Sequence, residues 1–213
     1  MIGIIDYGMG NIKSVANGII SAGGVVRVVD DPAEIRDCSS LVLPGVGAFR
    51  QAMENLSSAK FIDPIKGSVR DGMPILGVCL GMQLLAESSE EFGVTKGLGL
   101  VEGDVVAIPP SVDIRLPHMG WNEVEKTCRA DNYLFNGVPD NGCFYFVHSF
   151  RLQTKEEYLS SVTFHGSRIS ASLQVGNIFA TQFHPEKSQT NGARLLENFV
   201  AISNNYRVNK DNG

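Results

Sequence analysis

The sequence predicts an α/β fold, in which an open, mixed and mainly parallel sheet carries helices on both faces and gains antiparallel strands in the C-terminal half. Two observations lead to this prediction. In the first half of the chain, short apolar runs alternate with segments of helical period, the order typical of βαβ units and parallel sheets. In the second half, apolar runs follow one another with little helix between them, as antiparallel strands do.

The expected elements follow the chain in order. In the first half we expect a helix at 12–22 and strands at 1–6, 24–29, 40–43 and 74–78. In the second half we expect strands at 100–108, 122–125, 143–150, 158–164, 169–175 and 177–183, the last two joined by a tight turn at Gly176-Asn177. A final helix at 192–202 has one apolar face, formed by Leu195, Leu196, Phe199 and Val200. This arrangement is flavodoxin-like.

Length and composition limit the classes of function. A chain of 213 residues fits one domain, which we expect at 1–203, followed by a polar, frayed tail at 204–213. A net charge of -5 without a basic stripe argues against nucleic-acid binding, and no apolar run has the length of a membrane span or signal peptide. The four cysteines lack the spacing of a zinc site or disulfide framework, so we expect a reducing cytoplasm and neither metal nor cofactor.

The segment 74–85, with sequence PILGVCLGMQLL, places a cysteine between two glycines where an apolar strand is expected to give way to a helix. Its centre, 77–81, has the spacing of a nucleophile elbow, with sulfur in place of the serine oxygen of α/β hydrolases. Such a turn holds the nucleophile at a helix N-terminus, where the helix dipole favours the thiolate. Cys79 is therefore our candidate nucleophile, with a buried structural cysteine as the alternative.

A histidine and a glutamate after another apolar run are candidates for the remaining catalytic groups. A cysteine nucleophile needs a base to accept its proton and a third group to orient that base. The strand expected at 177–183 leads to His184, and Pro185 turns the chain so that Glu186 can fold back toward the imidazole. We interpret His184 as the base and Glu186 as the residue that orients it.

The other histidines and cysteines are interpreted as structural. His118 lies in a loop and His165 in a hairpin-like turn. His148 follows an apolar strand, so lining a pocket is the alternative for this residue. The remaining cysteines lack a glycine frame and are expected to be buried fillers, namely Cys38, Cys128 and Cys143.

Acyl transfer also requires N–H donors for the oxyanion. The residue after the nucleophile provides one donor, which here is the amide of Leu80. The loop 44–47, with sequence PGVG, follows a neighbouring strand and is expected to provide the second donor, from among Gly45, Val46 and Gly47. A phosphate-binding loop is the alternative here and at 8–10, but neither segment has the spacing of a nucleotide-binding motif.

Together these motifs resemble a known family. The sequence GVCLGMQ around Cys79 and the sequence HPE at 184–186 look like those of the class I, or triad, glutamine amidotransferases. Within this family, five motifs in the same order resemble the glutaminase subunits of imidazole glycerol phosphate synthases: IDYGMGN at 5–11, PGVG at 44–47, PHMGWN at 117–122, YFVHS at 145–149 and HPEKS at 184–188. The resemblance covers nearly the whole chain to about residue 202.

The resemblance implies hydrolysis of the side-chain amide of L-glutamine to glutamate and ammonia. It implies that Cys79 forms a thioester, that His184 transfers protons and that Glu186 orients His184. It also implies glutamine contacts from Gly47, Gln83, Glu91 and the backbone of Ser149 and Phe150. Gln83 lies one helical turn after Cys79 on the same helix face, whereas Glu91 has a solvated charge run as its alternative. Similar chains often carry tyrosine in place of Phe150, which matters little if only the backbone binds.

The resemblance further implies a partner, a (β/α)₈ cyclase subunit in a 1:1 heterodimer, which receives the ammonia through a tunnel. The loop 44–47 would hold its oxyanion amide turned away until the cyclase binds its ligand, so that the isolated chain has low activity. The interface candidates are Asp6, Asn11, Trp121, Tyr145 and Lys187.

Other functions remain open at the level of sequence. A branch of the same family delivers ammonia to a sugar-modifying synthase of surface-polysaccharide pathways, and these motifs do not separate the two. The glutaminase subunit of pyridoxal phosphate synthase shares the triad but lacks the loops at 44–47 and 117–121. From other classes, a flavodoxin-like module that binds a flavin or nucleotide and an inactive regulator are the alternatives.

Overall fold

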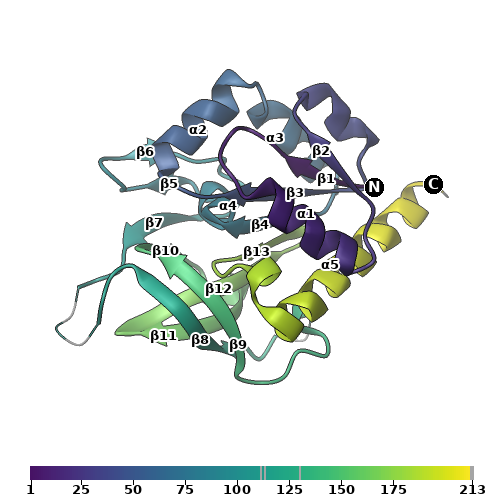
Figure 1. The fold of residues 1–213 in the computed structure, drawn as a ribbon. Coiled ribbons are helices and arrows are strands. Elements are labelled where there is room, and N and C mark those ends of the chain that lie inside the picture. Colours follow the sequence, from purple (N-terminus) through teal and green to yellow (C-terminus); the bar gives the residue numbers. More distant parts are fainter. Residues whose placement is uncertain (111, 113, 130, 212–213) are drawn as a thin grey trace.

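A computed structural model describes residues 1–110, 112, 114–129 and 131–211. Its main sheet has nine strands in the order β2-β1-β3-β4-β13-β12-β11-β8-β9 (Figure 1). Strands β2 to β13 in this order pair in parallel and those from β13 to β9 pair antiparallel. The strand bounds are β1 Ile2–Ile5, β2 Val26–Val29, β3 Ser40–Gly45, β4 Ile75–Cys79, β8 His118–Lys126, β9 Gly142–His148, β11 Leu159–His165, β12 Ser167–Val175 and β13 Ile178–Thr181. The predicted mixed sheet is confirmed.

A second, smaller sheet lies beside the carboxyl ends of the parallel strands. It has four strands in the order β10-β7-β5-β6, with bounds Phe150–Thr154, Gly103–Ala107, Ser88–Ser89 and Thr95–Lys96. The sequence did not indicate this sheet, because two of its strands have only two residues each and no period can be recognised in them.

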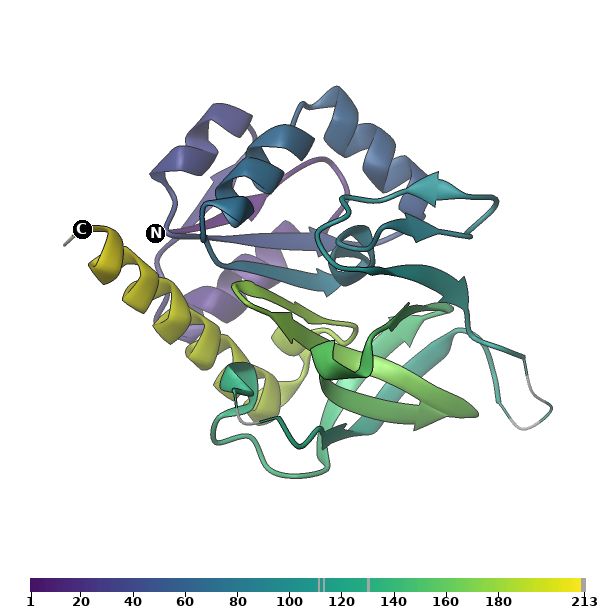
Figure 2. The ribbon, with the colours of Figure 1, turned by 180° about the vertical axis from the view of Figure 1, so that it is seen from behind.

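Helices cover both faces of the parallel strands (Figures 1 and 2). Their bounds are α1 Ile12–Ser21, α2 Phe49–Ser58, α3 Ile62–Arg70, α4 Leu80–Leu84 and α5 Gln189–Asp211, with short 3₁₀ turns η1 Pro32–Asp37, η2 Tyr133–Phe135, η3 Glu156–Tyr158 and η4 Pro185–Lys187. Ile4 packs in the apolar cluster formed with α1 and α5, and Ile5 packs in the one formed with α2, α3 and α4. Because successive side chains of a strand point to opposite faces of the sheet, the central strands have a buried core on each side.

Several predicted elements differ from the structure. Strand β8 begins at His118 and not at residue 122, because it pairs with β9 from His148 onward, so His118 lies in a strand and not in the predicted loop. The strand expected at 143–150 is divided at Ser149, where the chain passes from β9 in the main sheet to β10 in the small sheet. The Ser149 carbonyl accepts a hydrogen bond from the amide of Ile108 at 2.9 Å, which holds this crossing in place. The sequence predicted one strand here because it shows no sign that the chain passes from one sheet to the other at Ser149.

The C-terminal helix is longer than predicted. It continues to Asp211 through most of the segment that we expected to be frayed, while 212–213 lie outside the described residues. The Ser203 hydroxyl is buried and lies 2.9 Å from the Ser39 hydroxyl and 2.7 Å from the Ser40 hydroxyl, and Tyr206 packs against the apolar core. These contacts come from residues distant in the sequence, so the polar composition of the segment did not reveal them.

The described part of the chain contains no helix that is both long enough and apolar enough to cross a membrane.

Cys38 is buried, as expected, but Cys128 and Cys143 are exposed, which corrects their interpretation as buried fillers. Cys143 lies at an outward position of the alternating strand β9, and Cys128 lies just beyond the end of β8. The turn at Gly176-Asn177 joins the antiparallel strands β12 and β13, as predicted.

Candidate active site

Cys79 lies in a sharp turn between strand β4 and helix α4. Its φ of 56° is in the left-handed region, which is costly for a residue with a side chain and is found at strained functional turns. The flanking glycines permit the turn, since a Cβ on Gly77 would lie 2.8 Å from the Gly81 carbonyl oxygen and one on Gly81 would overlap the carbonyl of Leu43. The elbow geometry expected at 77–81 is therefore present.

His184 and Glu186 form a buried pair next to this elbow. The His184 Nδ1 atom is 2.8 Å from the Glu186 Oε1 atom, and the two side chains are 4% and 1% exposed. The 3₁₀ turn that begins at Pro185 folds the glutamate back on the histidine, as predicted. The His184 amide donates to the Tyr145 carbonyl at 2.9 Å, which ties this turn to strand β9.

The second ring nitrogen of His184, Nε2, has no hydrogen-bond partner among the described residues. Burial alone would lower the pKa of His184, but the adjacent Cys79, the hydrogen bond with Glu186 and the negative charges of both groups outweigh it and raise the pKa to about 9. The imidazole is therefore protonated at neutral pH when it faces a thiolate. A protonated imidazole beside a cysteine favours the nucleophilic thiolate.

The cysteine and the histidine line one cavity of about 400 Å³, a size suited to a small metabolite. The cavity brings together residues from both sheets and from the loop after β3. Its wall includes Val46, Gly47, Leu80, Gln83, Glu91, His148, Ser149 and Phe150. All residues expected to contact glutamine thus line the same cavity, and His148 borders it as well.

The loop after β3 lies beside the nucleophile because Gly45 is paired with Cys79 across the neighbouring parallel strands. A Cβ on Gly45 would lie 2.7 Å from the Tyr7 hydroxyl and 2.9 Å from Leu80 Cβ, so only glycine fits there. Gly47 has a φ of 98°, a conformation that favours glycine. The Tyr7 hydroxyl donates to the Pro44 carbonyl at 2.9 Å and anchors the start of the loop.

Gln83 is held by two partners on its amide nitrogen. This nitrogen donates to the Phe150 carbonyl at 3.1 Å and to Gln182 Oε1 at 2.9 Å, so only its oxygen remains to contact a substrate. Gln182 in turn directs its amide nitrogen at the sulfur of Cys79, 3.9 Å away. Sequence reasoning missed Gln182, although an amide among the apolar residues before His184 is a signal that could have been followed.

Glu91 is half-buried and lines the cavity. It follows strand β5, and its Oε2 accepts a hydrogen bond of 2.6 Å from the amide of Phe49, the first residue of α2. The residue before this helix, Ala48, has no side chain that could cap it. Glu91 therefore joins the small sheet to the helix that follows the loop 44–47.

The interface candidates form two groups. Trp121 and Tyr145 are directly opposite each other on β8 and β9, with ring centroids 6.1 Å apart, and the Lys187 ammonium lies 5.7 Å from the Tyr145 ring. Asp6 and Asn11 lie instead in the loop after β1. There Asp6 accepts a hydrogen bond from the Gly8 amide and Asn11 caps α1 by accepting one from Ser14.

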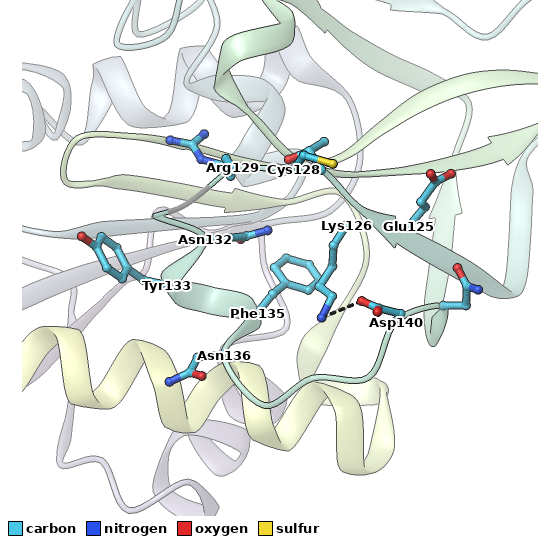
Figure 3. Close-up of a pocket in the computed structure, with 11 residues that line it drawn as sticks. Glu125, Lys126, Cys128, Arg129, Asn132, Tyr133, Phe135, Asn136 and Asp140 are labelled. Atoms are coloured by element: carbon cyan, nitrogen blue, oxygen red, sulfur yellow. Dashed lines mark ion pairs between the residues drawn. The ribbon is translucent and has the colours of Figure 1, made fainter.

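A larger hollow, of about 660 Å³, lies between the end of β8 and the turn η2 (Figure 3). Its charged groups other than the exposed Glu125 are paired within the protein. Arg129 pairs with Asp131 and donates to the carbonyls of Glu157, Tyr158 and Gln174, and Lys126 pairs with Asp140 at 2.8 Å. We therefore assign the functional site to the smaller cavity.

Comparison with known proteins agrees with this geometry. Residues 3–202 match the family model for class I glutamine amidotransferases. The chain is 45% identical to imidazole glycerol phosphate synthase subunit HisH 1 of Campylobacter jejuni, over 95% of this chain and 100% of that protein. It is also 45% identical to the HisH subunit of Methanosarcina barkeri, over 92% of this chain and 96% of that one.

Solved structures show the same fold at low identity. PurLQS of Thermotoga maritima gives a TM-score of 0.70 at 18% identity and covers 94% of this chain and 97% of that chain. The glutaminase domain of Trypanosoma brucei CTPS, solved with acivicin bound, gives a TM-score of 0.69 at 17% identity, covering 96% of this chain and 93% of that chain.

Proposed function

This chain belongs to the class I glutamine amidotransferases, and on that premise we propose that it is the glutaminase subunit of an imidazole glycerol phosphate synthase. The observation that carries the proposal is the cavity in which Cys79, held at a φ of 56°, meets the buried pair of His184 and Glu186. The 45% identity to HisH subunits over almost their full length supports the specific acceptor pathway, histidine biosynthesis.

The chemistry follows from the positions of these groups. The sulfur of Cys79 attacks the side-chain amide carbon of glutamine, and the tetrahedral oxyanion is received by the Leu80 amide and by an amide of the loop 45–47. His184 gives its proton to the departing nitrogen, so ammonia leaves and a thioester remains. His184 then takes a proton from water, whose oxygen attacks the thioester, and glutamate leaves as the thiolate of Cys79 and the protonated His184 are restored.

Glutamine binding uses the other walls of the cavity. Glu91 attracts the substrate ammonium with its carboxylate, and the backbone of Ser149 and Phe150 holds the α-carboxylate. The Gln83 oxygen and Gly47 contact the substrate between them. Each of these residues lines the cavity that contains Cys79, which supports the assignment.

The acceptor of the ammonia is a cyclase subunit in a 1:1 complex. We assign to this partner the surface formed by the exposed Trp121 and Lys187 and the half-buried Tyr145, together with Asp6 and Asn11. Because free ammonia is lost without an acceptor, we expect the loop 44–47 to complete the oxyanion site only when the cyclase holds its ligand. The cytoplasm is the compartment that suits such a biosynthetic complex.

The test is glutamate release from glutamine by the purified chain, alone and with the cyclase subunit of the same genome and its nucleotide ligand. We expect strong stimulation by partner and ligand, and none in Cys79→Ala. Stimulation by a sugar-modifying synthase and not by this cyclase would assign the chain to polysaccharide synthesis. No Cys79-dependent release under any condition would overturn the glutaminase assignment and favour a binding or regulatory role.

A further inference from the structure

A line of hydrogen bonds crosses three strands and ends in the wall of the active-site cavity. Asn122 Nδ2 is 3.1 Å from His118 Nε2, and His118 Nδ1 is 2.9 Å from His148 Nε2. His148 Nδ1 is 2.8 Å from the carbonyl oxygen of Phe150. His118 and His148 are directly opposite each other on β8 and β9, so the antiparallel register itself brings the two rings together.

The direction of every bond in this line is fixed from its ends. The Phe150 carbonyl can only accept, so His148 carries its proton on Nδ1 and its Nε2 accepts from His118 Nδ1. His118 Nε2 therefore accepts from the amide nitrogen of Asn122. The orientation of that amide is set because its oxygen accepts from the Glu123 amide at 2.9 Å and its nitrogen also donates to the Phe164 carbonyl at 3.0 Å.

Packing holds both rings in the neutral form that this order requires. The His118 ring is stacked between Phe146 and His165, with centroids 4.8 and 4.2 Å away, and only 4% of His118 and 6% of His148 is exposed. Burial, with contributions from the charges of neighbouring histidines, lowers the pKa of His118 to about 3 and that of His148 to about 4.

The Phe150 carbonyl receives a second hydrogen bond, from Gln83. Gln83 is joined through Gln182 to Cys79, so this one carbonyl is held both from the side of the nucleophile and from strand β8. The adjacent Ser149 carbonyl is held by the Ile108 amide. A backbone segment fixed at two successive carbonyls presents its remaining groups to the cavity in one orientation.

We propose that His118 and His148 are positioning residues for the α-carboxylate of glutamine, which act by orienting the backbone of Ser149 and Phe150 from strand β8. The inference rests on the proposed function, because that function places the carboxylate on this backbone. Neither histidine is a proton carrier in the reaction, since each ring has both nitrogens engaged in the line.

The test compares two substitutions of one residue in the complex with the cyclase and its ligand. In His148→Asn the amide nitrogen occupies about the place of Nδ1 and can still donate to Phe150, whereas in His148→Gln it reaches the place of Nε2 and cannot. We expect KM for glutamine to rise about tenfold in His148→Gln with kcat within about twofold of the parent, and His148→Asn to stay within about threefold of the parent KM. His165→Phe, which keeps the stacked ring outside the line, is the matched control and should leave KM unchanged.

A second substrate shows whether the carboxylate is the group concerned. The compound 4-aminobutanamide is glutamine without its α-carboxylate. In His148→Gln, kcat/KM for glutamine should fall about tenfold, whereas kcat/KM for 4-aminobutanamide should stay the same. The preference for glutamine should therefore fall about tenfold. An unchanged preference, or an equal loss with both substrates, would overturn the inference. Failure of the unsubstituted complex to hydrolyse glutamine would instead overturn the proposed function.

A measurement without substitution protects the test against a variant that does not fold. The ¹⁵N chemical shifts of the histidine rings in the unsubstituted protein at pH 7 distinguish the two neutral tautomers from the protonated form. We expect the Nδ1–H tautomer for both His118 and His148. The Nε2–H tautomer, or a protonated ring, in either residue would contradict the line of hydrogen bonds and with it the inference.

Discussion

The two halves of the main sheet contribute to the site in different ways. Strands β1, β3 and β4 of the parallel half are buried at every position, whereas β8 and β9 of the antiparallel half alternate between inside and outside. The parallel half supplies backbone, in the form of the Cys79 elbow and the loop after β3. The antiparallel half supplies side chains, such as the ring of His148 in the cavity wall and that of His118 behind it.

This difference explains what a substitution should do in each half. Where two backbone segments are in contact, there is no space for an added methyl group, so the backbone must shift and the fold is destabilised. Where side chains form a directed line, a substitution can remove one hydrogen bond and leave the fold in place. The elbow region should therefore respond in stability, and the antiparallel strands should respond in substrate binding, pH dependence and association.

The largest effect on the fold is expected at Gly81. Its added Cβ would overlap the Leu43 carbonyl, a backbone atom that cannot rotate away. We expect Gly81→Ala to lower the free energy of unfolding by about 3 kcal/mol or more, measured by urea denaturation. Gly67→Ala is the matched control, because nothing lies within 4 Å of a Cβ built there and its helix, α3, should gain about 0.5–1 kcal/mol. A Gly81→Ala protein as stable as Gly67→Ala would remove the distinction between the halves.

Histidines of the two regions should give opposite pH dependence of stability. The pKa of His148 is lowered to about 4 in the folded chain, so its contribution is present above the unfolded value of 6.5 and is lost as the pH falls toward 4. The pKa of His184 is raised to about 9, so its contribution is present below 6.5 and is lost as the pH rises through 9. The loss at His148 is roughly 3 kcal/mol for a change of this size.

Urea denaturation at pH 5, 7 and 9 measures both slopes. His148→Asn should remove about half of the histidine contribution to the difference between pH 5 and pH 7, and His184→Asn should remove part of the difference between pH 7 and pH 9. In the first variant, the buried His118 remains, and its pKa is lowered to about 3. It therefore still makes the free energy of unfolding fall between pH 7 and pH 5, as His148 does in the parent. Equal slopes in the variants and the parent would show that these rings are not the source.

Glu91 links the two kinds of contribution, because it holds a backbone amide and also faces the cavity. Glu91→Gln keeps an oxygen that can accept from Phe49 but loses the charge for the substrate ammonium. We expect its KM for glutamine to rise about tenfold while its stability falls by less than about 0.5 kcal/mol. Glu91→Ala should lose about 1–2 kcal/mol of stability in addition. If the two variants were equally stable, the capping of α2 by Glu91 would have no energetic importance.

The contrast between the halves also governs what could be predicted from the sequence. The elbow was visible because Gly77 and Gly81 flank Cys79 within one short segment, a spacing that can be recognised without knowing the order of the strands. The backbone that requires Gly81, however, belongs to Leu43 of the neighbouring strand. The pair of His184 and Glu186 was visible because a proline between them forces the turn. Motifs whose residues lie within a few positions of one another can be recognised in the sequence, and the triad is formed by two of them.

The antiparallel half depends on register between distant segments, which a single sequence does not state. His118 and His148 meet only because β8 and β9 pair in one register, and Gln182 reaches Cys79 only through the order of the strands. The small sheet and the extension of α5 beyond Ser203 were missed for the same reason. Cys128 and Cys143 were placed wrongly because composition alone suggests burial for cysteine.

The smallest effect on the fold is expected at Lys187, on the outer surface of the antiparallel half. Its side chain is exposed and lies over the Tyr145 ring at 5.7 Å, a contact worth about 0.5–1 kcal/mol at most. Lys187→Met should therefore leave the free energy of unfolding within about 1 kcal/mol of the parent, while binding of the cyclase, measured by titration calorimetry, weakens. Lys66→Met, in helix α3 and away from the residues assigned to this surface, is a control that should change neither quantity. Unchanged cyclase affinity in Lys187→Met would leave this surface without the role that its exposed aromatic and cationic groups suggest, and would restrict the contribution of the antiparallel half to the cavity wall.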